Sequence, residues 1–364
     1  MTWALFWEWL IKSLILIFTL LGGFAYTTYY ERRWIARIQV RVGPNRAGPL
    51  GLLQPIADAV KLIFKEELTP GKVYKLVFFL APLLTMVPSL VIAAVIPWGT
   101  SFMLGDRRIY LHLVNINVGT LYLMSVASIA VYGIVLAGWS SNNKYAMLGG
   151  LRSSAQMISY ELTLGMAFVT AILLGNSMSM VDIVNGQREW WFAAIQPVGF
   201  ILFFIAVLAE VNRAPFDMPE AEQELTAGYH TEYSGMKFAL FFMAEYQKMI
   251  VVSMIAATLF LGGYLGWGVD KFPFLGPLYL FGKVFLLLGV MIWIRAAWPR
   301  IRYDRLMSFG WKVMLPLSLA IVFITATGIL IGSSWFILIA SLLAAIVAVV
   351  SVYIALRRKA YEFA

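Results

Sequence analysis

The stretch YKLVFFLAPLLTMVPSLVIAAVIP, residues 74–97, contains a single charged side chain. A helix of about 20 apolar residues is long enough to cross the hydrocarbon core of a bilayer, which is roughly 30 Å thick. Similar apolar runs recur along the whole sequence. They predict an all-α polytopic membrane protein, one transmembrane domain over residues 1–364, with nine spans at residues 10–30, 74–97, 117–139, 153–175, 195–213, 236–264, 276–298, 313–333 and 335–356.

The composition argues against most classes of soluble protein. Of the 364 residues, 61% are hydrophobic and 13% are charged, whereas soluble globular proteins average roughly 25% charged residues. Cysteine is absent, so the chain offers no thiolates for an iron–sulfur cluster, a zinc site or a disulfide. Neither a Walker loop nor a Rossmann glycine pattern is present. We therefore expect no metal site and no bound nucleotide in this chain, and any redox metal must lie on a partner.

Positive charge is distributed unevenly between alternate loops. The net charge of +9 would suggest nucleic acid in a soluble protein, but we expect no nucleic-acid partner because the charges follow the predicted topology. One set of loops, with the C-terminal tail, carries most of the Lys and Arg, whereas the opposite loops carry only Arg107, Arg108, Arg188 and Lys271. The positive-inside rule predicts an outside N-terminus and a cytoplasmic C-terminus. The first span is expected to be retained, and the expected location is the bacterial plasma membrane.

The first predicted inner loop, residues 31–73, begins ERRWIARIQVRVGPNRAGPLGLLQPIADAVKLIFKEE. After two Gly-Pro steps, apolar and polar residues recur with helical spacing, which predicts an amphipathic helix in the plane of the membrane interface. Charges of both signs beside a Gly/Pro turn suggest the polar mouth of a pocket. The residues expected to form that mouth are Glu31, Arg32, Arg33, Arg37 and Asp58. For Arg41 and Arg46, the alternative is a role only in setting the orientation of the chain.

The acidic inner loop, residues 209–236, concentrates carboxylates at one end of the predicted bundle. Glu210, Asp217, Glu220, Glu222 and Glu224 lie within it. Like charges crowded near a membrane cannot all ionise cheaply, so some of these groups are expected to hold protons near neutral pH. That property suits proton sharing. The alternative for Glu220, Glu222 and Glu224 is a solvated acidic surface that docks a basic partner, and the two interpretations are compatible.

Two further carboxylates are predicted to lie inside the membrane. Glu161 and Glu245 are each on the order of 12 Å from the inner end of their helix. A charge at this depth is costly, so both residues are candidates for a functional role. Glu245 could instead pair with Lys248 on its own helix. Lys283 and Arg295 are either counter-ions of these carboxylates or cations that extend to the interface.

Longer motifs point to a family. Residues 31–66, GWSSNNKYAMLGGLRSSAQMISYE at 138–161, EVNRAPFDMPEAEQELTAGYHTEYS at 210–234 and RAAWPRIRYDRL at 295–306 together resemble the subunit 1 (or H-type) family of the proton-pumping NADH:quinone oxidoreductase, respiratory complex I. The resemblance covers nearly the whole chain. It implies a subunit at the heel of the membrane arm, with an eight-helix core plus a C-terminal helix, that forms a quinone chamber with peripheral subunits.

The resemblance also implies roles for individual residues. The quinone chamber would be lined by Glu31, Arg32, Arg33, Arg37, Asp58, Lys61, Arg213 and Asp217. The proton relay would contain Glu161, Glu210, Glu220, Glu222, Glu224 and Glu245. Some family members have a carboxylate where this chain has Ser128, so the resemblance does not carry a relay through that helix to this chain. The ninth span is not universal in the family.

The implied function is that of a membrane subunit of a proton-translocating NADH:quinone oxidoreductase, with no redox centre of its own. Quinone would be the substrate, and FMN and iron–sulfur clusters would be held by partner subunits only. The implied partners are peripheral-arm quinone-site and iron–sulfur subunits, small membrane-arm subunits, antiporter-like subunits and membrane lipid. The alternatives are the membrane anchor of a related energy-converting hydrogenase and a stand-alone secondary transporter, although no inverted repeat is visible in the sequence.

Overall fold

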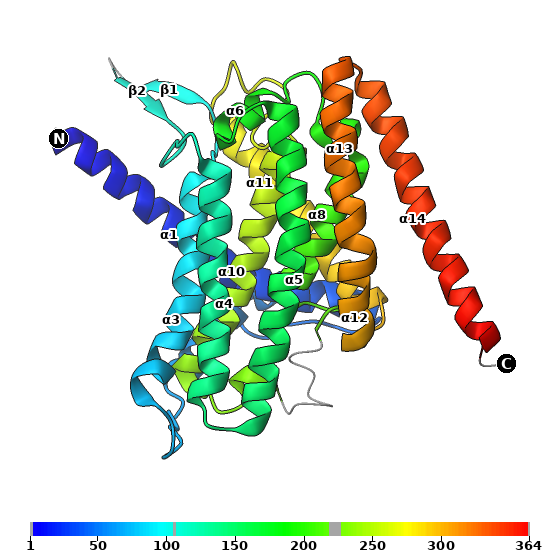
Figure 1. The fold of residues 1–364 in the computed structure, drawn as a ribbon. Coiled ribbons are helices and arrows are strands. Elements are labelled where there is room, and N and C mark those ends of the chain that lie inside the picture. Colours follow the sequence, from blue (N-terminus) through cyan, green and yellow to red (C-terminus); the bar gives the residue numbers. More distant parts are fainter. Residues whose placement is uncertain (1–2, 105–106, 218–226, 363–364) are drawn as a thin grey trace.

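Long helices dominate the structure, a computed structural model that describes residues 3–104, 107–217 and 227–362 (Figure 1). Eight helices in this part of the chain are long and apolar enough to cross a membrane, counting α12 and α13 as one continuous span. The long helices are α1 (Trp3–Ile38), α3 (Lys75–Ile92), α4 (Gly119–Ser140), α5 (Lys144–Gly175), α10 (Gly235–Phe260), α11 (Leu275–Ala297), α13 (Leu315–Ile331) and α14 (Ser334–Glu362). The expected all-α polytopic membrane fold is confirmed.

The segment expected to form the fifth span is shorter than a spanning helix. It is α8 (Pro197–Glu210), whose 14 residues extend about 21 Å, less than the roughly 30 Å of a bilayer core. Pro197 favours the start because it lacks the N–H that a preceding helical turn would use. Asn212, with a φ of 54°, turns the chain away soon after the end. Glu210, the last residue of this helix, is therefore held inside the bundle, where it is buried.

Short elements connect the long helices. They are η1 (Pro49–Gly51), α2 (Gln54–Ile63), η2 (Ala93–Val95), α6 (Met180–Asn185), α7 (Phe192–Ile195), η3 (Gly228–His230), α12 (Tyr303–Phe309) and the π-helical turn η4 (Gly310–Met314). Strand β1 (Ser101–Leu104) pairs antiparallel with β2 (Arg107–Tyr110). We call the end of the bundle at these strands the hairpin end. The opposite end, near residues 211–217 and η3, is called the loop end (Figure 1).

Helix α10 is the centre of the bundle. It packs against α1, α3 and α11, and it is the most buried of the helices that could span a membrane. Its residues Met249 to Phe260 belong to the main core together with α5, α8 and α11. Helices in a bilayer are held by close packing and by polar contacts between them, because lipid provides little hydrophobic driving force. Polar side chains on α10 are therefore in a position to bind several neighbours at once.

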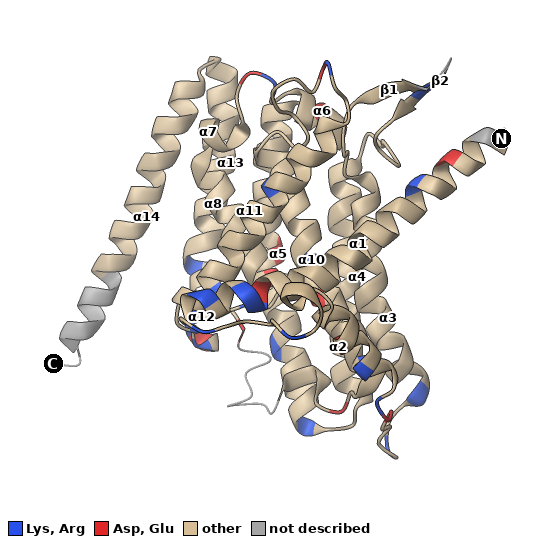
Figure 2. Ribbon diagram, turned by 180° about the vertical axis from the view of Figure 1, so that it is seen from behind, with Lys and Arg blue, Asp and Glu red and all other residues tan. Residues whose placement is uncertain are grey.

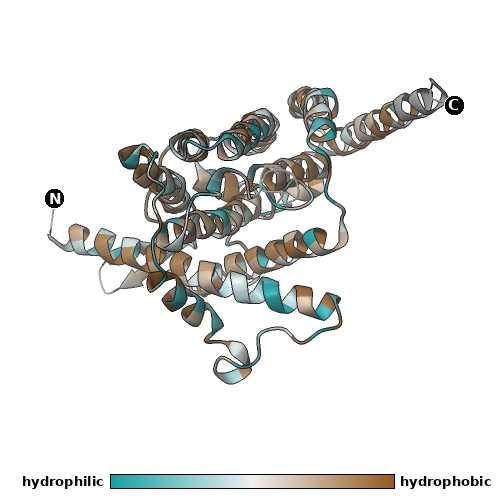
Figure 3. Ribbon diagram, turned by 90° about the horizontal axis from the view of Figure 1, so that it is seen from below, coloured by the Kyte–Doolittle hydropathy of each residue, from teal (hydrophilic) through white to brown (hydrophobic). Residues whose placement is uncertain are grey.

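Helices α1 and α14 diverge from the bundle on opposite sides (Figures 1 and 3). Apolar residues cover outward faces as well as the core, and large side chains such as Phe18, Tyr132, Leu330 and Val347 are exposed. Lys and Arg are most frequent at the loop end, on and near α2 and α12 (Figure 2). An apolar exterior with charges gathered at one end is what a membrane protein requires.

Candidate functional site

Two carboxylates and two guanidinium groups meet inside the loop-end half of the bundle. Glu31 of α1 is 3% exposed, and its Oε1 contacts Arg295 of α11 and lies 3.4 Å from Arg213. The Nε of Arg213 is also 2.5 Å from Oε1 of Glu245 in α10. Burying an isolated charge is expensive, so each carboxylate depends on its cationic partner. Because Arg213 is shared between Glu31 and Glu245, a change of charge on one carboxylate is felt by the other.

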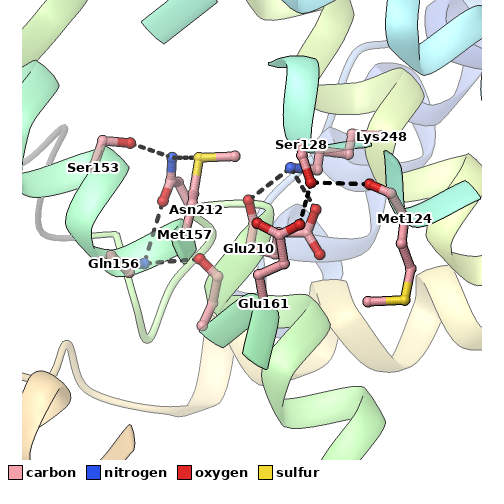
Figure 4. Close-up of polar contacts among 10 residues, drawn as sticks. Met124, Ser128, Ser153, Gln156, Met157, Glu161, Glu210, Asn212 and Lys248 are labelled. Carbon is pink, nitrogen blue, oxygen red and sulfur yellow. Dashed lines mark hydrogen bonds and ion pairs between the residues drawn. The ribbon is translucent and has the colours of Figure 1, made fainter. Parts of the chain in front are cut away.

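Neutral hydrogen bonds from α5 fix the backbone that carries Arg213. The side chain of Gln156 donates to the main-chain oxygen of Phe216 at 2.9 Å. The side chain of Asn212 donates to Ser153 Oγ at 2.8 Å (Figure 4). Asn212 has a positive φ, which asparagine tolerates better than most residues. The position of Arg213 is therefore set by the packing of its loop on α5 as well as by its charged partners.

A second ion pair lies one helical turn further along α10. Lys248 Nζ is 2.9 Å from Glu210 Oε1 and donates to the main-chain oxygen of Glu210 at 3.1 Å (Figure 4). The last carbonyls of a helix lack partners within the helix and carry partial negative charge, so an ammonium is stabilised there. The alternative pairing of Glu245 with Lys248 is not what the structure shows. Glu245 pairs with Arg213, and Lys248 pairs with Glu210.

Glu161 of α5 forms a hydrogen bond with Ser128 of α4 (Figure 4). Ser128 Oγ also lies 3.0 Å from the main-chain oxygen of Met124. A hydroxyl has one proton to donate, and a carbonyl only accepts. Ser128 can donate to an ionised Glu161, or accept from a protonated Glu161 while donating to Met124. This surrounding thus accommodates both protonation states of the carboxyl group.

Three separate cavities lie between these charged groups and share lining residues. One of about 40 Å³ is lined by Glu161, Glu210 and Lys248, and another of about 40 Å³ by Glu210, Lys248 and Glu245. A third, of about 140 Å³, is lined by Glu245 and Asp217 at the loop end. About 10–15 Å³ is enough for one water molecule. Charged side chains and spaces of this size therefore alternate from Asp217 to Glu161.

We call these alternating side chains and cavities, together with Glu31 and Arg213, the charged series. Asp217 lies at its loop end, 3.3 Å from Arg300. Burial raises the pKa of Asp217 to about 6, against the opposing effect of the Arg300 and Arg213 charges. Burial also lowers the pKa of His230, which lines the same cavity, to about 4. Near neutral pH, Asp217 is consequently close to its titration range, whereas His230 is neutral.

One oxygen of each of three carboxylates is buried without a hydrogen-bond partner among the described residues. These oxygens belong to Glu31, Glu210 and Asp217. Buried polar atoms in proteins are normally satisfied, and an exception calls for an explanation such as a water or a proton. Glu210 and Asp217 line the cavities of the series. The unpartnered oxygens of Glu210 and Asp217 are therefore places where a proton or a water molecule can bind.

A separate cavity of about 360 Å³ lies between α1, α2 and α10. Its charged lining comes from Arg32, Asp58 and Lys61, and Arg32 pairs with Asp58 at 2.5 Å. The rest is mainly apolar and includes Phe24 and Phe242. A cavity of several hundred Å³ with a few polar groups on one side is typical of a small-molecule site. It can receive a molecule with a polar head and an apolar tail.

Comparison with known proteins identifies the family of this chain. The model of a family described as NADH dehydrogenase matches residues 11–326. The chain belongs to the NADH dehydrogenase family. It is 51% identical over 334 residues to the second of two H-type subunits of NADH-quinone oxidoreductase in Geobacter metallireducens, covering 88% of this chain and 95% of that protein. The H-type subunit of Rhodospirillum rubrum is 50% identical over 321 residues, 87% and 92% of the two chains, and that of Protochlamydia amoebophila 50% over 303 residues, 83% and 91%.

Membership of the NADH dehydrogenase family confirms the resemblance seen in the sequence motifs. The family match ends at residue 326, before α14 begins at Ser334. The expectation that the last span is not universal in the family stays a prediction. None of the relatives' names assigns a role to a particular residue of this chain.

The structure brings most of the candidate site residues into two places. The charged series contains Glu31, Glu161, Glu210, Arg213, Asp217 and Glu245, and the cavity beside α2 contains Arg32, Asp58 and Lys61. Arg33 does not line that cavity and instead donates to the hydroxyl of Tyr29 and to the main-chain oxygen of Leu50. Arg37 is exposed at the end of α1 and lines neither place. Glu220, Glu222 and Glu224 lie outside the described residues.

Several partners were not identified from the sequence. Lys283 is not a counter-ion of the buried carboxylates, because it binds main-chain oxygens at the hairpin end. Arg295 is a counter-ion, of Glu31. The sequence indicates Lys248 only as a local partner of Glu245. Its pairing with Glu210 joins residues 38 positions apart, a separation for which helical periodicity gives no signal.

Proposed function

We propose that this chain is the membrane subunit of an NADH:quinone oxidoreductase that lines the quinone site and carries the effect of quinone reduction to proton translocation. The observation that supports this most strongly is the alternation of charged side chains and water-sized cavities from Asp217 through Glu245, Lys248 and Glu210 to Glu161. Its close relatives are named as subunits of this enzyme. That similarity favours the oxidoreductase over the hydrogenase anchor and the transporter.

The cavity beside α2 is the proposed quinone site. Its apolar lining suits an isoprenoid tail, and Arg32, Asp58 and Lys61 suit the polar head. Both oxygens of Asp58 are held: Arg32 pairs with Oδ2, and Gln54 donates to Oδ1 at 3.1 Å. Partner subunits would complete the chamber and hold FMN and the iron–sulfur clusters, since this chain has no cysteine.

The coupling would begin at the shared guanidinium. A change of charge near Asp217 alters the field at Arg213, which is held between Glu31 and Glu245. When Arg213 moves its charge towards Glu31, Glu245 loses part of its compensation and binds a proton more readily. Glu210, paired with Lys248, would receive that proton next and pass it to Glu161, each step transferring one proton through an intervening water.

The orientation follows from the same proposal. The loop end, which carries most of the Lys and Arg, would face the cytoplasm of a bacterium, with the N-terminus outside. Peripheral-arm subunits would dock at the loop end. The small membrane-arm and antiporter-like subunits would contact the helices laterally and receive protons beyond Glu161.

The test is to replace Glu161, Glu210 and Glu245 by Gln, one at a time, in the assembled complex in inside-out membrane vesicles. Each change keeps the shape of the side chain but removes its proton exchange. We expect Glu161→Gln to assemble normally, and Glu210→Gln and Glu245→Gln to assemble in smaller amount because each removes a carboxylate from a buried ion pair. Coupled quinone reduction and proton uptake, measured per assembled complex, should fall at least fivefold in all three. Asp182→Asn is the matched control, because Asp182 lies at the hairpin end, where it accepts a hydrogen bond from Ser177. Wild-type pumping in all three Gln variants would rule out the relay.

A further inference from the structure

A large cavity at the hairpin end lies apart from the charged series. Its volume is about 640 Å³, and its walls are the N-terminal half of α1, the β hairpin and the adjoining ends of α10 and α11. Most of the lining is apolar, with Leu16, Leu20, Ile109, Met254 and Phe281 among its residues. The space exists because α1 leaves the bundle at an angle towards its N-terminus (Figure 1).

Two charged side chains line this cavity near the N-terminus. Glu8 Oε1 lies 2.6 Å from Lys12 Nζ, and their side chains are only 23% and 12% exposed. An ion pair in an apolar wall of a membrane protein is costly and calls for a polar partner. Trp7 and Trp98 line the same cavity, and tryptophan is typical of the level of the lipid headgroups. The cavity thus combines a polar part at interface level with an apolar body, the pattern of an amphiphile.

His112 adds no positive charge beside Lys12 at neutral pH. His112, in the segment that follows the hairpin, is half-buried and lies close enough to experience the Lys12 charge. Burial, and to a smaller extent Lys12, lower the pKa of His112. The histidine is therefore neutral at neutral pH and does not compete with Lys12 for an anionic group.

The cavity closes before it crosses the membrane. Leu20 is 2% exposed, and a Cβ atom on Gly23 would lie 3.2 Å from Ile250, so α1 packs directly on α10 from this point. Glu8 and Leu20 are about 18 Å apart along α1, similar to the roughly 15 Å of one leaflet. A transmembrane helix of another subunit would have to continue through both leaflets. An acyl chain ends at the middle of the bilayer, and the length from Glu8 to Leu20 matches such a chain better than a helix that crosses both leaflets.

We propose that the cavity binds one phospholipid with a primary ammonium headgroup, of the phosphatidylethanolamine class. Its phosphate would accept hydrogen bonds from Lys12, its ammonium would donate to Glu8, and an acyl chain would lie along Leu16 and Leu20. Charge-assisted hydrogen bonds of this kind are stronger than neutral ones. An anionic glycerol headgroup has a phosphate but no cation to pair with Glu8, and a choline headgroup has no N–H to donate. The proposal does not rest on the proposed relay.

The test uses the whole complex, reconstituted in nanodiscs of equal parts phosphatidylethanolamine, phosphatidylcholine and phosphatidylglycerol. A photoreactive amino acid at the position of Ile15, which lines the cavity, is activated and the cross-linked species are identified by mass. We expect phosphatidylethanolamine adducts at least fivefold above either other lipid. Lys12→Met should lose most of the adduct, and Glu8→Gln should reduce the preference over phosphatidylglycerol. Thr19→Phe, which fills the cavity, should lose the adduct with all lipids.

Arg188→Met is the matched control. It breaks an exposed ion pair with Asp270, 3.7 Å long and away from this cavity, so the adduct should remain unchanged. Equal labelling of the three headgroups would mean annular lipid only and would overturn the proposal. A cross-link to another subunit's polypeptide would overturn it as well. The headgroup preference is measured with the photoreactive amino acid as the sole change in the chain. The proposal can therefore be tested even if Lys12→Met, Glu8→Gln or Thr19→Phe prevents assembly.

Discussion

The two halves of α10 hold their polar side chains in different ways. In the loop-end half, Glu245 and Lys248 pair with charged side chains from other elements. In the hairpin-end half, the hydroxyls of Ser253 and Thr258 donate to carbonyls of the preceding turn, at 2.8 Å and 3.0 Å. The first arrangement contains carboxyl groups, Glu245 and Glu210, whose charge can change by binding a proton. The second only completes the hydrogen bonding of the backbone.

Lys283, the buried cation at the hairpin end, also binds main-chain oxygens. Lys283 Nζ donates to the main-chain oxygens of Leu261, Gly263 and Leu265, at 2.7–2.9 Å. An ammonium has three donors, so all of them are used. These carbonyls follow the C-terminus of α10, where a cation is stabilised. A charge within a membrane helix is therefore a candidate for a relay when a cavity that it lines is also lined by another carboxylate, as at Glu161 and Glu245, and not when its partners are main-chain oxygens.

The largest effect should come from removing the shared guanidinium. Arg213→Met leaves Glu245 without its partner, and removing one member of a buried ion pair costs about 3–5 kcal/mol. We expect little assembled complex and almost no quinone reductase activity, measured by native gel electrophoresis and an assay of the membranes. Adding Glu245→Gln to Arg213→Met should restore part of the assembly but not pumping. Full assembly of the single variant would contradict the pairing.

A smaller loss is expected at Ser128. Ser128→Ala removes the hydrogen bond that orients Glu161, worth about 0.5–1.5 kcal/mol, or a factor of roughly 2 to 10 in rate. The measurement is coupled proton uptake in vesicles. Ser128→Thr keeps the hydroxyl and should keep most of the activity. Ser125→Ala is the control, because Ser125 donates only to Leu121 in the same helix and is exposed. Equal rates for the two alanine variants would remove Ser128 from the series.

Asp217 should link stability to pH. Its pKa is raised to about 6 from an ordinary value of 3.8, so the folded protein keeps a proton that the unfolded chain has released. Stability contributed by this group therefore falls as pH rises from about 4 to 6, by at most about 3 kcal/mol. Asp217→Asn should flatten this part of the curve when the Tm of the complex is measured from pH 4 to 8. An identical slope in both proteins would show that Asp217 is not held in this way.

Turnover should be least affected by Lys283→Met. The change leaves carbonyls at the end of α10 without their donor, and each unsatisfied group costs about 1–3 kcal/mol. We expect a lower Tm with quinone reductase activity per assembled complex within about twofold of wild type. Loss of turnover in fully assembled Lys283→Met complex would contradict the purely structural role of the polar contacts at the hairpin end.

Hydropathy predicts the membrane helices well, because a bilayer requires long apolar runs. It does not predict that the helix within 195–213 is α8, with only 14 residues. Burial within a bundle and exposure to lipid select the same residue types, so the pattern cannot separate a spanning helix from an enclosed one. The tilt of α1, which creates the cavity at Leu16 and Leu20, is likewise set by packing and leaves no mark in the composition.

The depth of Glu161 and Glu245 identified them from the sequence, whereas their partners depended on the fold. Glu31 and Arg213 are 182 positions apart, and nothing in the spacing of either residue indicates the contact. Local periodicity suggested the wrong partner for Lys248, since Glu245 three positions away is drawn instead to Arg213. Long-range pairing is decided by how α8, α10 and the loop at residues 211–217 pack together.

The central claim is that the carboxylates from Glu245 to Glu161 change protonation when quinone is reduced. Redox-triggered infrared difference spectroscopy of the assembled complex measures this directly, because only a protonated carboxyl group has a carboxylic acid C=O band. We predict such a band in the wild type and in Asp182→Asn, with its intensity reduced in Glu245→Gln, Glu210→Gln and Glu161→Gln. A spectrum identical in the wild type and all three Gln variants would contradict the relay.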